Sequence, residues 1–287
     1  MKIFTVLLVA VLHFPCVSAY AQSLGDFAKE EQTRRNSIPA TKTITIRLEP
    51  LAEASGKEIS TANPADEENT DFSPGEIQLR SAPTSDPKKN LDYAFYIPAN
   101  WNEYTQHPVI VLVPGLNGRG ENMINRAWID LAEEWMAALV APSFVFEGEE
   151  AFSQEKSYQY PAAWSGSALQ SVIKQLRDTG LEITKLYMVG FSAGAQFVGR
   201  YSLLYPQDIQ KCAIVGSGGN STILSSNDVE YFYAIGGKEQ QLRKDSARIF
   251  HEEAEKNAIK ITLKEYPGVG HDFTPQIQSD IIKFFKQ

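Results

Sequence analysis

The sequence is poor in cysteine and histidine, with only two and four of them among 287 residues. Cys16 lies in an N-terminal segment that we expect to be removed, so Cys212 would remain alone and could form no intramolecular disulfide. The histidines are scattered, and no group of His, Cys and Asp has the spacing of metal ligands. We therefore expect no disulfide framework, no metal and no cofactor.

The sequence also lacks an excess of positive charge and a long hydrophobic run. The formal net charge is −8, which argues against a nucleic-acid partner. The apolar run Ile3 to Leu12 is shorter than the roughly 20 residues that span a bilayer, so no stable membrane insertion is expected. Lys2 before this run and Ala19-Tyr20-Ala21 after it predict a cleavable signal peptide, residues 1–21, and a secreted or periplasmic protein.

A lipid anchor on Cys16 is the alternative reading of this segment. His13-Phe14-Pro15 do not supply the small residues that usually precede a lipidated cysteine, so export without an anchor is the prediction. Residues 22–75 then form a polar extension with one alternating strand, Thr43 to Leu48, and a flexible loop. Residues 76–287 have the apolar runs of one large domain.

Within this domain, two short strands precede a regular alternation of strands and helices. Strands are predicted at Glu76–Arg80, Asp92–Ile97, Val109–Val113, Leu139–Phe144, Lys185–Val189, Ala213–Val215, Tyr231–Ile235 and Ile259–Tyr266; helices are predicted at Asn122–Met136, Gly166–Arg177, Ala195–Leu204, Leu242–Lys256 and Ile277–Phe285. Continuous apolar strands favour a mostly parallel sheet covered on both faces, with antiparallel strands at its N-terminal edge. Such α/β sheets bind ligands at the carboxyl ends of their strands.

The segment Gly190-Phe191-Ser192-Ala193-Gly194 follows a buried strand and opens a helix. The pattern G-x-S-x-G in this context is typical of a nucleophile elbow, in which the flanking glycines allow a turn sharp enough to expose the serine. Ser192 is therefore the candidate nucleophile. The amide of Ala193, at the helix N-terminus, is a candidate oxyanion-hole donor.

A serine hydroxyl needs a base, and the position of each histidine decides which one is suitable. His13 leaves with the signal peptide, His107 precedes its strand, and His251 lies on a charged helix. His271 follows the last strand, in a loop at the correct edge of the sheet, and is the candidate general base.

The carboxylate that orients this base is expected after the strand Tyr231–Ile235. Glu239 is the candidate, and Asp245 is the alternative, although it falls in the next predicted helix. The loop Pro114 to Gly120 follows a central strand and should supply the second oxyanion donor, Leu116 first and Asn117 next.

The order of these motifs, G-F-S-A-G, then G-G-K-E, then G-V-G-H-D, resembles the α/β-hydrolase superfamily over about residues 93–287. D-Y-A-F-Y-I-P followed by V-I-V-L-V-P-G-L-N-G-R-G is similar to the secreted polyhydroxybutyrate depolymerase, feruloyl esterase and dienelactone hydrolase-like group. The resemblance implies an ester-cleaving catalytic triad in an α/β-hydrolase fold. This chain departs from the group's usual pattern at Pro114, where a histidine is common, and at Ala195, where a second glycine is common.

The substrate is expected to be a small-molecule or polymeric ester, since residues 218–229 are too few for a large lid domain. Phe152, Tyr158, Tyr160 and Trp164 either form an aromatic wall for the substrate or pack their loop onto the domain. Tyr160, Trp164 and Asn117 are the candidate substrate-binding residues. The alternatives to an esterase are a peptidase or acyltransferase with the same three residues, and a catalytically silent binding protein of the same fold.

Overall fold

The computed structural model describes residues 73–84, 90–101, 106–144, 153–154, 156–178, 180–219 and 221–287. All of them belong to one compact unit, Asp66–Gln287. The predicted signal peptide, the strand Thr43 to Leu48 and Phe152 lie outside the described residues. Among those that are described, no helix combines the length and the apolar character needed to cross a membrane.

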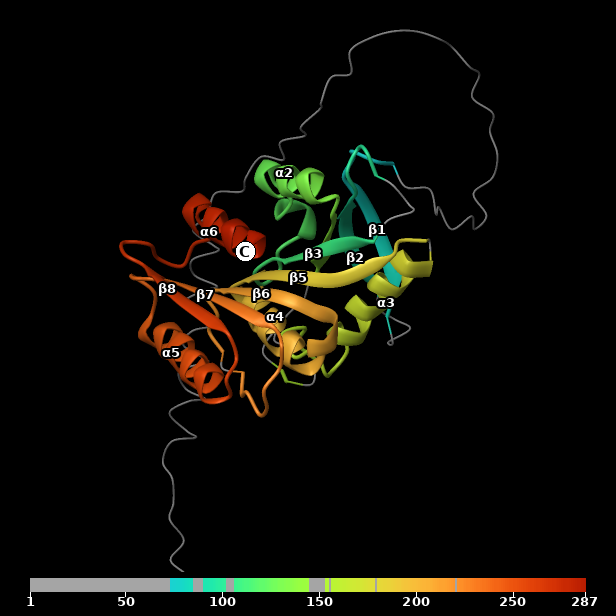
Figure 1. The fold of residues 1–287 in the computed structure, drawn as a ribbon. Coiled ribbons are helices and arrows are strands. Elements are labelled where there is room, and N and C mark those ends of the chain that lie inside the picture. Colours follow the sequence, from blue (N-terminus) through green and yellow to red (C-terminus); the bar gives the residue numbers. More distant parts are fainter. Residues whose placement is uncertain are drawn as a thin grey trace, which may run out of the picture. The chain divides into compact units, whose positions relative to one another are not determined.

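After two initial strands, the described chain alternates strands with helices, except that β7 follows β6 with no helix among the described residues between them (Figure 1). The strands are β1 (Gln78–Pro83), β2 (Asn90–Tyr96), β3 (His107–Val113), β4 (Ala138–Ser143), β5 (Ile183–Phe191), β6 (Ile209–Val215), β7 (Glu230–Gly236) and β8 (Ile261–Tyr266). The helices are α2 (Arg126–Trp135), α3 (Ser165–Asp178), α4 (Ala193–Leu204), α5 (Gln241–Lys256) and α6 (Pro275–Lys286), with short 3₁₀ turns η1 (Gly120–Asn122) and η3 (Pro206–Asp208).

The eight strands form one sheet in the order β1-β2-β4-β3-β5-β6-β7-β8. β1 pairs with β2 and β2 with β4 in antiparallel fashion, and every later pair is parallel. The predicted α/β fold, mostly parallel with antiparallel strands at its N-terminal edge, is thereby confirmed. The crossover from β4 back past β3 to β5 creates a reversal of strand order, which is where α/β sheets bind ligands.

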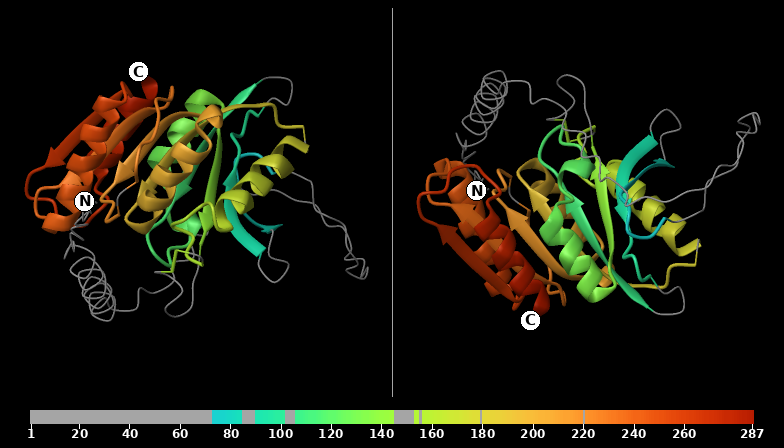
Figure 2. Two further views of the ribbon diagram at one scale, coloured as in Figure 1. Left: turned by 90° about the horizontal axis from the view of Figure 1, so that it is seen from below. Right: turned by 90° about the horizontal axis from the view of Figure 1, so that it is seen from above.

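Each face of the sheet is covered by its own group of helices. Val109, Val111 and Val113 of β3 pack with residues of α3, α4 and α5, whereas Ile110 and Leu112 pack with residues of α2 and α6. Figure 2 shows the same division, with α3 to α5 in front of the sheet in the view from below and α2 and α6 in front of it from above. Because both faces are buried in the middle of the sheet, β3, β4 and β7 carry continuous apolar runs, as predicted, whereas exposed residues alternate along the edge strands β1 and β8.

The helix predicted from Asn122 to Met136 begins later than expected. Residues 120–122 form a 3₁₀ turn, and α2 starts at Arg126 because the Asn125 side chain caps it, accepting a hydrogen bond of 3.3 Å from the Trp128 amide. Met136, with φ 53°, ends the helix in the left-handed conformation. The other predicted elements occur at their places, with ends displaced by a few residues.

The loops that follow β3, β5, β6, β7 and β8 leave the same edge of the sheet. The connection between β6 and β7, residues 216–229, contains no helix among its described residues, which are all but residue 220. No large lid domain is evident in the part of the chain that the structure describes. Several loops at this edge can therefore contribute residues to one site.

Candidate active site

Ser192 lies at the sharp turn between β5 and α4, where its backbone adopts φ 58° and ψ −115°. A non-glycine residue with this conformation is strained, and such strain is held in place only by the surrounding structure. The Ser192 amide donates to the Val215 carbonyl at 2.9 Å, which ties the turn to the end of β6. The side chain is thereby presented at the carboxyl edge of the sheet.

Gly190 and Gly194 are required by close backbone contacts on both sides of this serine. A Cβ at Gly190 would lie 2.3 Å from the Gly194 carbonyl oxygen, and one at Gly194 would lie 2.3 Å from the Pro114 carbonyl oxygen. Real Cβ atoms do not approach so closely, so any larger residue would displace the turn. The two glycines thus allow α4 to begin directly against the end of β3.

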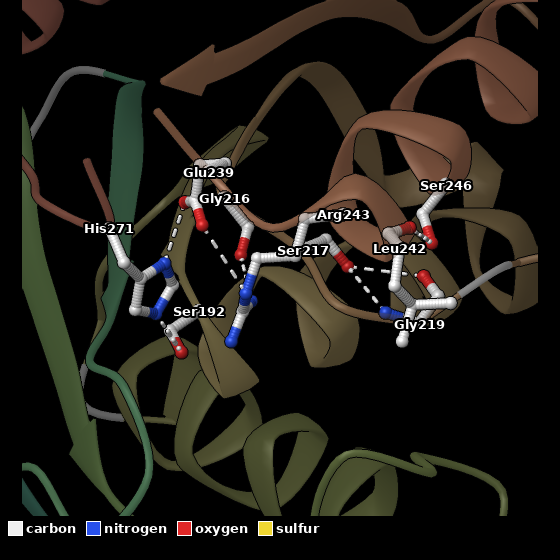
Figure 3. Close-up of polar contacts among 9 residues, drawn as sticks. All are labelled: Ser192, Gly216, Ser217, Gly219, Glu239, Leu242, Arg243, Ser246 and His271. Carbon is white, nitrogen blue, oxygen red and sulfur yellow. Dashed lines mark hydrogen bonds and ion pairs between the residues drawn. The ribbon is translucent and has the colours of Figure 1, made fainter. Parts of the chain in front are cut away.

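The structure brings Ser192, His271 and Glu239 together in a chain of hydrogen bonds (Figure 3). His271 Nε2 lies 2.8 Å from Ser192 Oγ, and His271 Nδ1 lies 2.7 Å from Glu239 Oε1. A carboxylate only accepts hydrogen bonds, so Nδ1 carries the hydrogen and Nε2 is left to accept the serine proton. This is the tautomer that a general base needs.

Two backbone hydrogen bonds hold the loop of Glu239 against the loop of His271. The Gly237 amide donates to the Tyr266 carbonyl and the Lys238 amide to the Val269 carbonyl, each at 2.8 Å. Glu239 is 8% exposed, and its side chain is 2% exposed. The carboxylate and the imidazole are therefore brought together by their loops and not by side-chain freedom.

The alternative residues of the sequence analysis lie elsewhere. Asp245, in α5, accepts a hydrogen bond of 3.0 Å from Gln241 on an exposed part of the helix. His107, at the amino end of β3, is buried with Nδ1 2.7 Å from the Met136 carbonyl oxygen. His251 pairs with Glu255 on α5 at 3.4 Å. None of these three bonds joins them to Ser192.

The loop after β3 lies directly against the nucleophile. A Cβ at Gly115 would lie 3.5 Å from the Cβ of Ser192, and the Gly118 amide closes a turn by donating to the Gly115 carbonyl at 2.9 Å. Leu116 and Asn117 occupy the centre of this turn, and Asn117 has the positive φ of 53° that the third position of a type II turn requires. Ala193 is the first residue of α4, where amides have no partner within the helix.

The aromatic residues of the predicted wall differ in their exposure. Tyr158 is fully buried and stacks on Phe144 with ring centroids 4.7 Å apart, so it packs its segment onto the domain. Trp164, half-buried, packs edge-on against Phe144 and donates to the Lys156 carbonyl. Tyr160, also half-buried, lies under the Arg200 guanidinium at 4.1 Å. Contact of Tyr160 and Trp164 with a substrate stays a prediction.

Three contributors to the site were not predicted from the sequence. Phe191 stacks on His271 with centroids 4.9 Å apart, Gly216 packs against the His271–Glu239 contact, and Arg243 pairs with Glu239. The pairing of Arg243 could have been predicted, because Glu239 and Arg243 are four residues apart at the start of a charged helix. Gly216 and Phe191 carry no comparable signal, because their roles depend on contacts with distant loops.

The nearby buried ionisable groups are not suited to replace the serine. Burial raises the pKa of the Cys212 thiol to about 12, and the side chain lies inside the core beside α4. Burial also raises the pKa of the Tyr233 phenol.

Within the described ranges, no group of three or more His, Cys, Asp or Glu side chains is arranged to hold a metal ion.

The strand order, the strained serine and the loop placement of the other two residues define the α/β-hydrolase fold. The chain belongs to the dienelactone hydrolase family, whose model matches residues 94–283, and thus to the carboxylic ester hydrolases. No curated protein matches the sequence.

Solved structures share the fold at low sequence identity. An S-formylglutathione hydrolase from Agrobacterium tumefaciens is 15% identical with a TM-score of 0.57, over 72% of this chain and 92% of that one. An esterase from Thermogutta terrifontis is 12% identical with a TM-score of 0.56, over 73% and 90%. A Bacteroides ovatus protein described as a dipeptidyl aminopeptidase IV is 12% identical with a TM-score of 0.61, over 74% of this chain and only 35% of that chain.

Proposed function

We propose that the protein is an exported serine esterase that cleaves carboxylic esters through an acyl-enzyme intermediate. The observation that carries this proposal is the hydrogen-bonded series from Ser192 Oγ through His271 to Glu239 Oε1. The strained backbone of Ser192 at a helix N-terminus adds to it, because that position offers amides to a developing oxyanion.

In the first half of the reaction, Ser192 Oγ forms a bond to the ester carbonyl carbon while its proton passes to His271 Nε2. The tetrahedral oxyanion is stabilised by the amides of Ala193 and Leu116. The bond from the carbonyl carbon to the alcohol oxygen then breaks, and His271 returns the proton to that oxygen. Glu239 stabilises the imidazolium that exists between these two transfers.

In the second half, water attacks the acyl carbon and gives its proton to His271. The bond to Ser192 Oγ breaks, the serine recovers its proton, and the carboxylic acid leaves. Neither half of the proposed reaction requires a metal ion. The connection of residues 216–229, which forms no helix among its described residues, supports a bulky or polymeric ester as substrate as well as a small one.

Hydrolysis of p-nitrophenyl esters of short, long and aromatic acids tests the proposal. Wild-type enzyme should release p-nitrophenol from at least one of these esters, and Ser192→Ala should not. Equal activity of the two proteins would exclude Ser192 as the nucleophile.

A peptidase is the second candidate, because the fold is shared with the Bacteroides ovatus protein described as a dipeptidyl aminopeptidase IV. Peptide anilides assayed beside the esters separate the two, and added alcohol acceptors reveal acyl transfer. We expect kcat/KM to be higher for esters than for anilides.

Export rests on the sequence pattern of residues 1–21 alone. When the full chain is expressed in a bacterial host, the mature protein should be recovered outside the cytoplasm with Gln22 as its first residue. Intact-mass measurement checks this, and a mature protein that retains Lys2 would contradict it.

A further inference from the structure

A buried arginine lies behind the candidate triad. Arg243, in the first turn of α5, places Nε 3.4 Å from Glu239 Oε2, and the two side chains are 3% and 2% exposed. Glu239 Oε1 faces His271 at 2.7 Å. The carboxylate is thus shared between a histidine on one oxygen and an arginine on the other (Figure 3).

Arg243 also holds the backbone that packs against this pair. Its Nη1 donates to the Gly216 carbonyl oxygen at 2.5 Å. Gly216 has φ 60°, and a Cβ there would lie 2.9 Å from Glu239 Oε1 and 3.2 Å from His271 Nδ1. One guanidinium therefore fixes both the carboxylate and the backbone in contact with the carboxylate–imidazole hydrogen bond.

The chemistry of arginine suits this position better than that of lysine. The guanidinium is planar and always charged, and it can bond two groups at once in a fixed geometry. A buried carboxylate with one unpaired oxygen would be costly, and Arg243 pairs with the second oxygen of Glu239 and holds that side chain in place. The same cation offsets part of the negative charge that faces His271.

We propose that Arg243 is a positioning residue that acts through Glu239 and Gly216 to orient His271 and to set the pH range in which it works as a base. The inference rests on the proposed function, because it assigns a role within the same site. Two further titratable groups belong to these surroundings: the buried Tyr233 phenol on β7, which interacts electrostatically with Arg243 and Glu239, and the exposed Asp272, next to His271 in the sequence.

The first test is Arg243→Met, which keeps most of the side-chain volume and removes the charge and its donors. Because a misplacement of about 1 Å costs roughly 10²-fold, kcat/KM should fall roughly 10- to 100-fold. The fall should come from kcat and not from KM. The acid limb of the pH profile of kcat/KM should move up by about 0.5–1 pH unit, since the imidazolium would then face an uncompensated carboxylate.

Two further variants separate charge from geometry. Arg243→Lys keeps the cation without the planar fork, so it should restore the pH profile while kcat stays low. Arg248→Met is the matched control, because Arg248 pairs with Glu252 on the same helix with the same four-residue spacing but both side chains are more than half exposed. It should leave kcat/KM and the pH profile unchanged.

A double-mutant cycle decides whether Arg243 acts through Glu239. In the background of Glu239→Gln, the change Arg243→Met should cost less than threefold, since the carboxylate it orients is gone. This double variant also removes both buried charges together, so it remains informative if Arg243→Met alone folds poorly.

An unchanged acid limb in Arg243→Met would overturn the inference, and so would losses that multiply fully in the double variant. The activity of Ser192→Ala separates a failure of the proposed function from a failure of the role of Arg243. If Ser192→Ala retains turnover, the proposed function fails. If Ser192→Ala is inactive while Arg243→Met behaves as wild type, only the role of Arg243 fails.

Discussion

Among the described residues, each end of the central sheet buries a cation, and the candidate triad lies at the carboxyl end. At the amino end, Lys211 of β6 is 5% exposed, donates to the Phe284 carbonyl at 2.9 Å and lies 3.5 Å from Glu230. At the carboxyl end, Arg243 is 2% exposed and is held by Gly216 and Glu239. Burial and pairing alone therefore do not identify a functional charge.

The histidines at the two ends of the sheet also differ, in the groups that their ring nitrogens contact. His107 Nδ1 lies 2.7 Å from the Met136 carbonyl oxygen, and its ring packs on Trp101 with centroids 3.8 Å apart. His271 Nδ1 meets a carboxylate at 2.7 Å, while Nε2 meets a hydroxyl on a strained backbone. A histidine that joins a carboxylate to a hydroxyl can transfer a proton, whereas one held by a backbone carbonyl and a ring supports packing.

The largest contrast is expected between the two histidines. Ser192→Ala and His271→Ala should each lower kcat by about 10⁶-fold, because residues of a catalytic triad act as a unit and we propose that these two belong to one. His107→Gln should leave kcat within about twofold and lower the free energy of unfolding by about 1–3 kcal/mol through loss of a buried partner. Ester hydrolysis and urea unfolding measure both, and a large loss of kcat in a folded His107→Gln would refute the division between the ends.

A smaller contrast is expected among the carboxylates. Glu239→Gln should lower kcat by roughly 10³- to 10⁴-fold, because an amide leaves His271 without a charge to stabilise its protonated form. Asp245→Asn should have no measurable effect, since its bond is to Gln241 on the helix. Steady-state kinetics of the two variants, side by side, check the assignment. A nearly silent Glu239→Gln would mean that another group orients the base.

The buried lysine at the amino end should matter for stability alone. Lys211→Met keeps the stem but leaves the Phe284 carbonyl without this donor, which should cost about 1–3 kcal/mol of unfolding free energy. Glu230 keeps its bond of 3.0 Å to Lys260, so the loss should not be larger. Urea unfolding measures the change, and kcat/KM should stay within about twofold of wild type.

The smallest effect concerns the pH dependence of stability. The hydrogen bond from Lys260 lowers the pKa of Glu230 below its usual range. A depressed carboxyl pKa contributes stability above the unfolded value of about 4.3, and this contribution is lost as the pH falls through the folded value. Glu230→Gln should therefore flatten the stability curve between about pH 5 and 3. An identical slope in the two proteins would exclude a role for this pair.

Most elements of the fold in the described residues were predictable from the sequence for local physical reasons, and so were three residues that the structure places within hydrogen-bond distance of one another. Apolar runs define buried strands, and the glycines around Ser192 reflect backbone contacts of neighbouring segments. The start of α2 was predicted too early, because the capping side chain of Asn125 was not recognised. Arg243 and Gly216 were not identified, since their contacts join separate loops across the sheet edge.

Covalent labelling with a fluorophosphonate probe tests the central claim most directly. The probe should attach to one site in wild-type protein, and peptide mapping should place it on Ser192, while Ser192→Ala stays unlabelled and His271→Ala reacts far more slowly. Labelling of Ser192→Ala at the wild-type rate, or of wild type at another residue, would contradict the account.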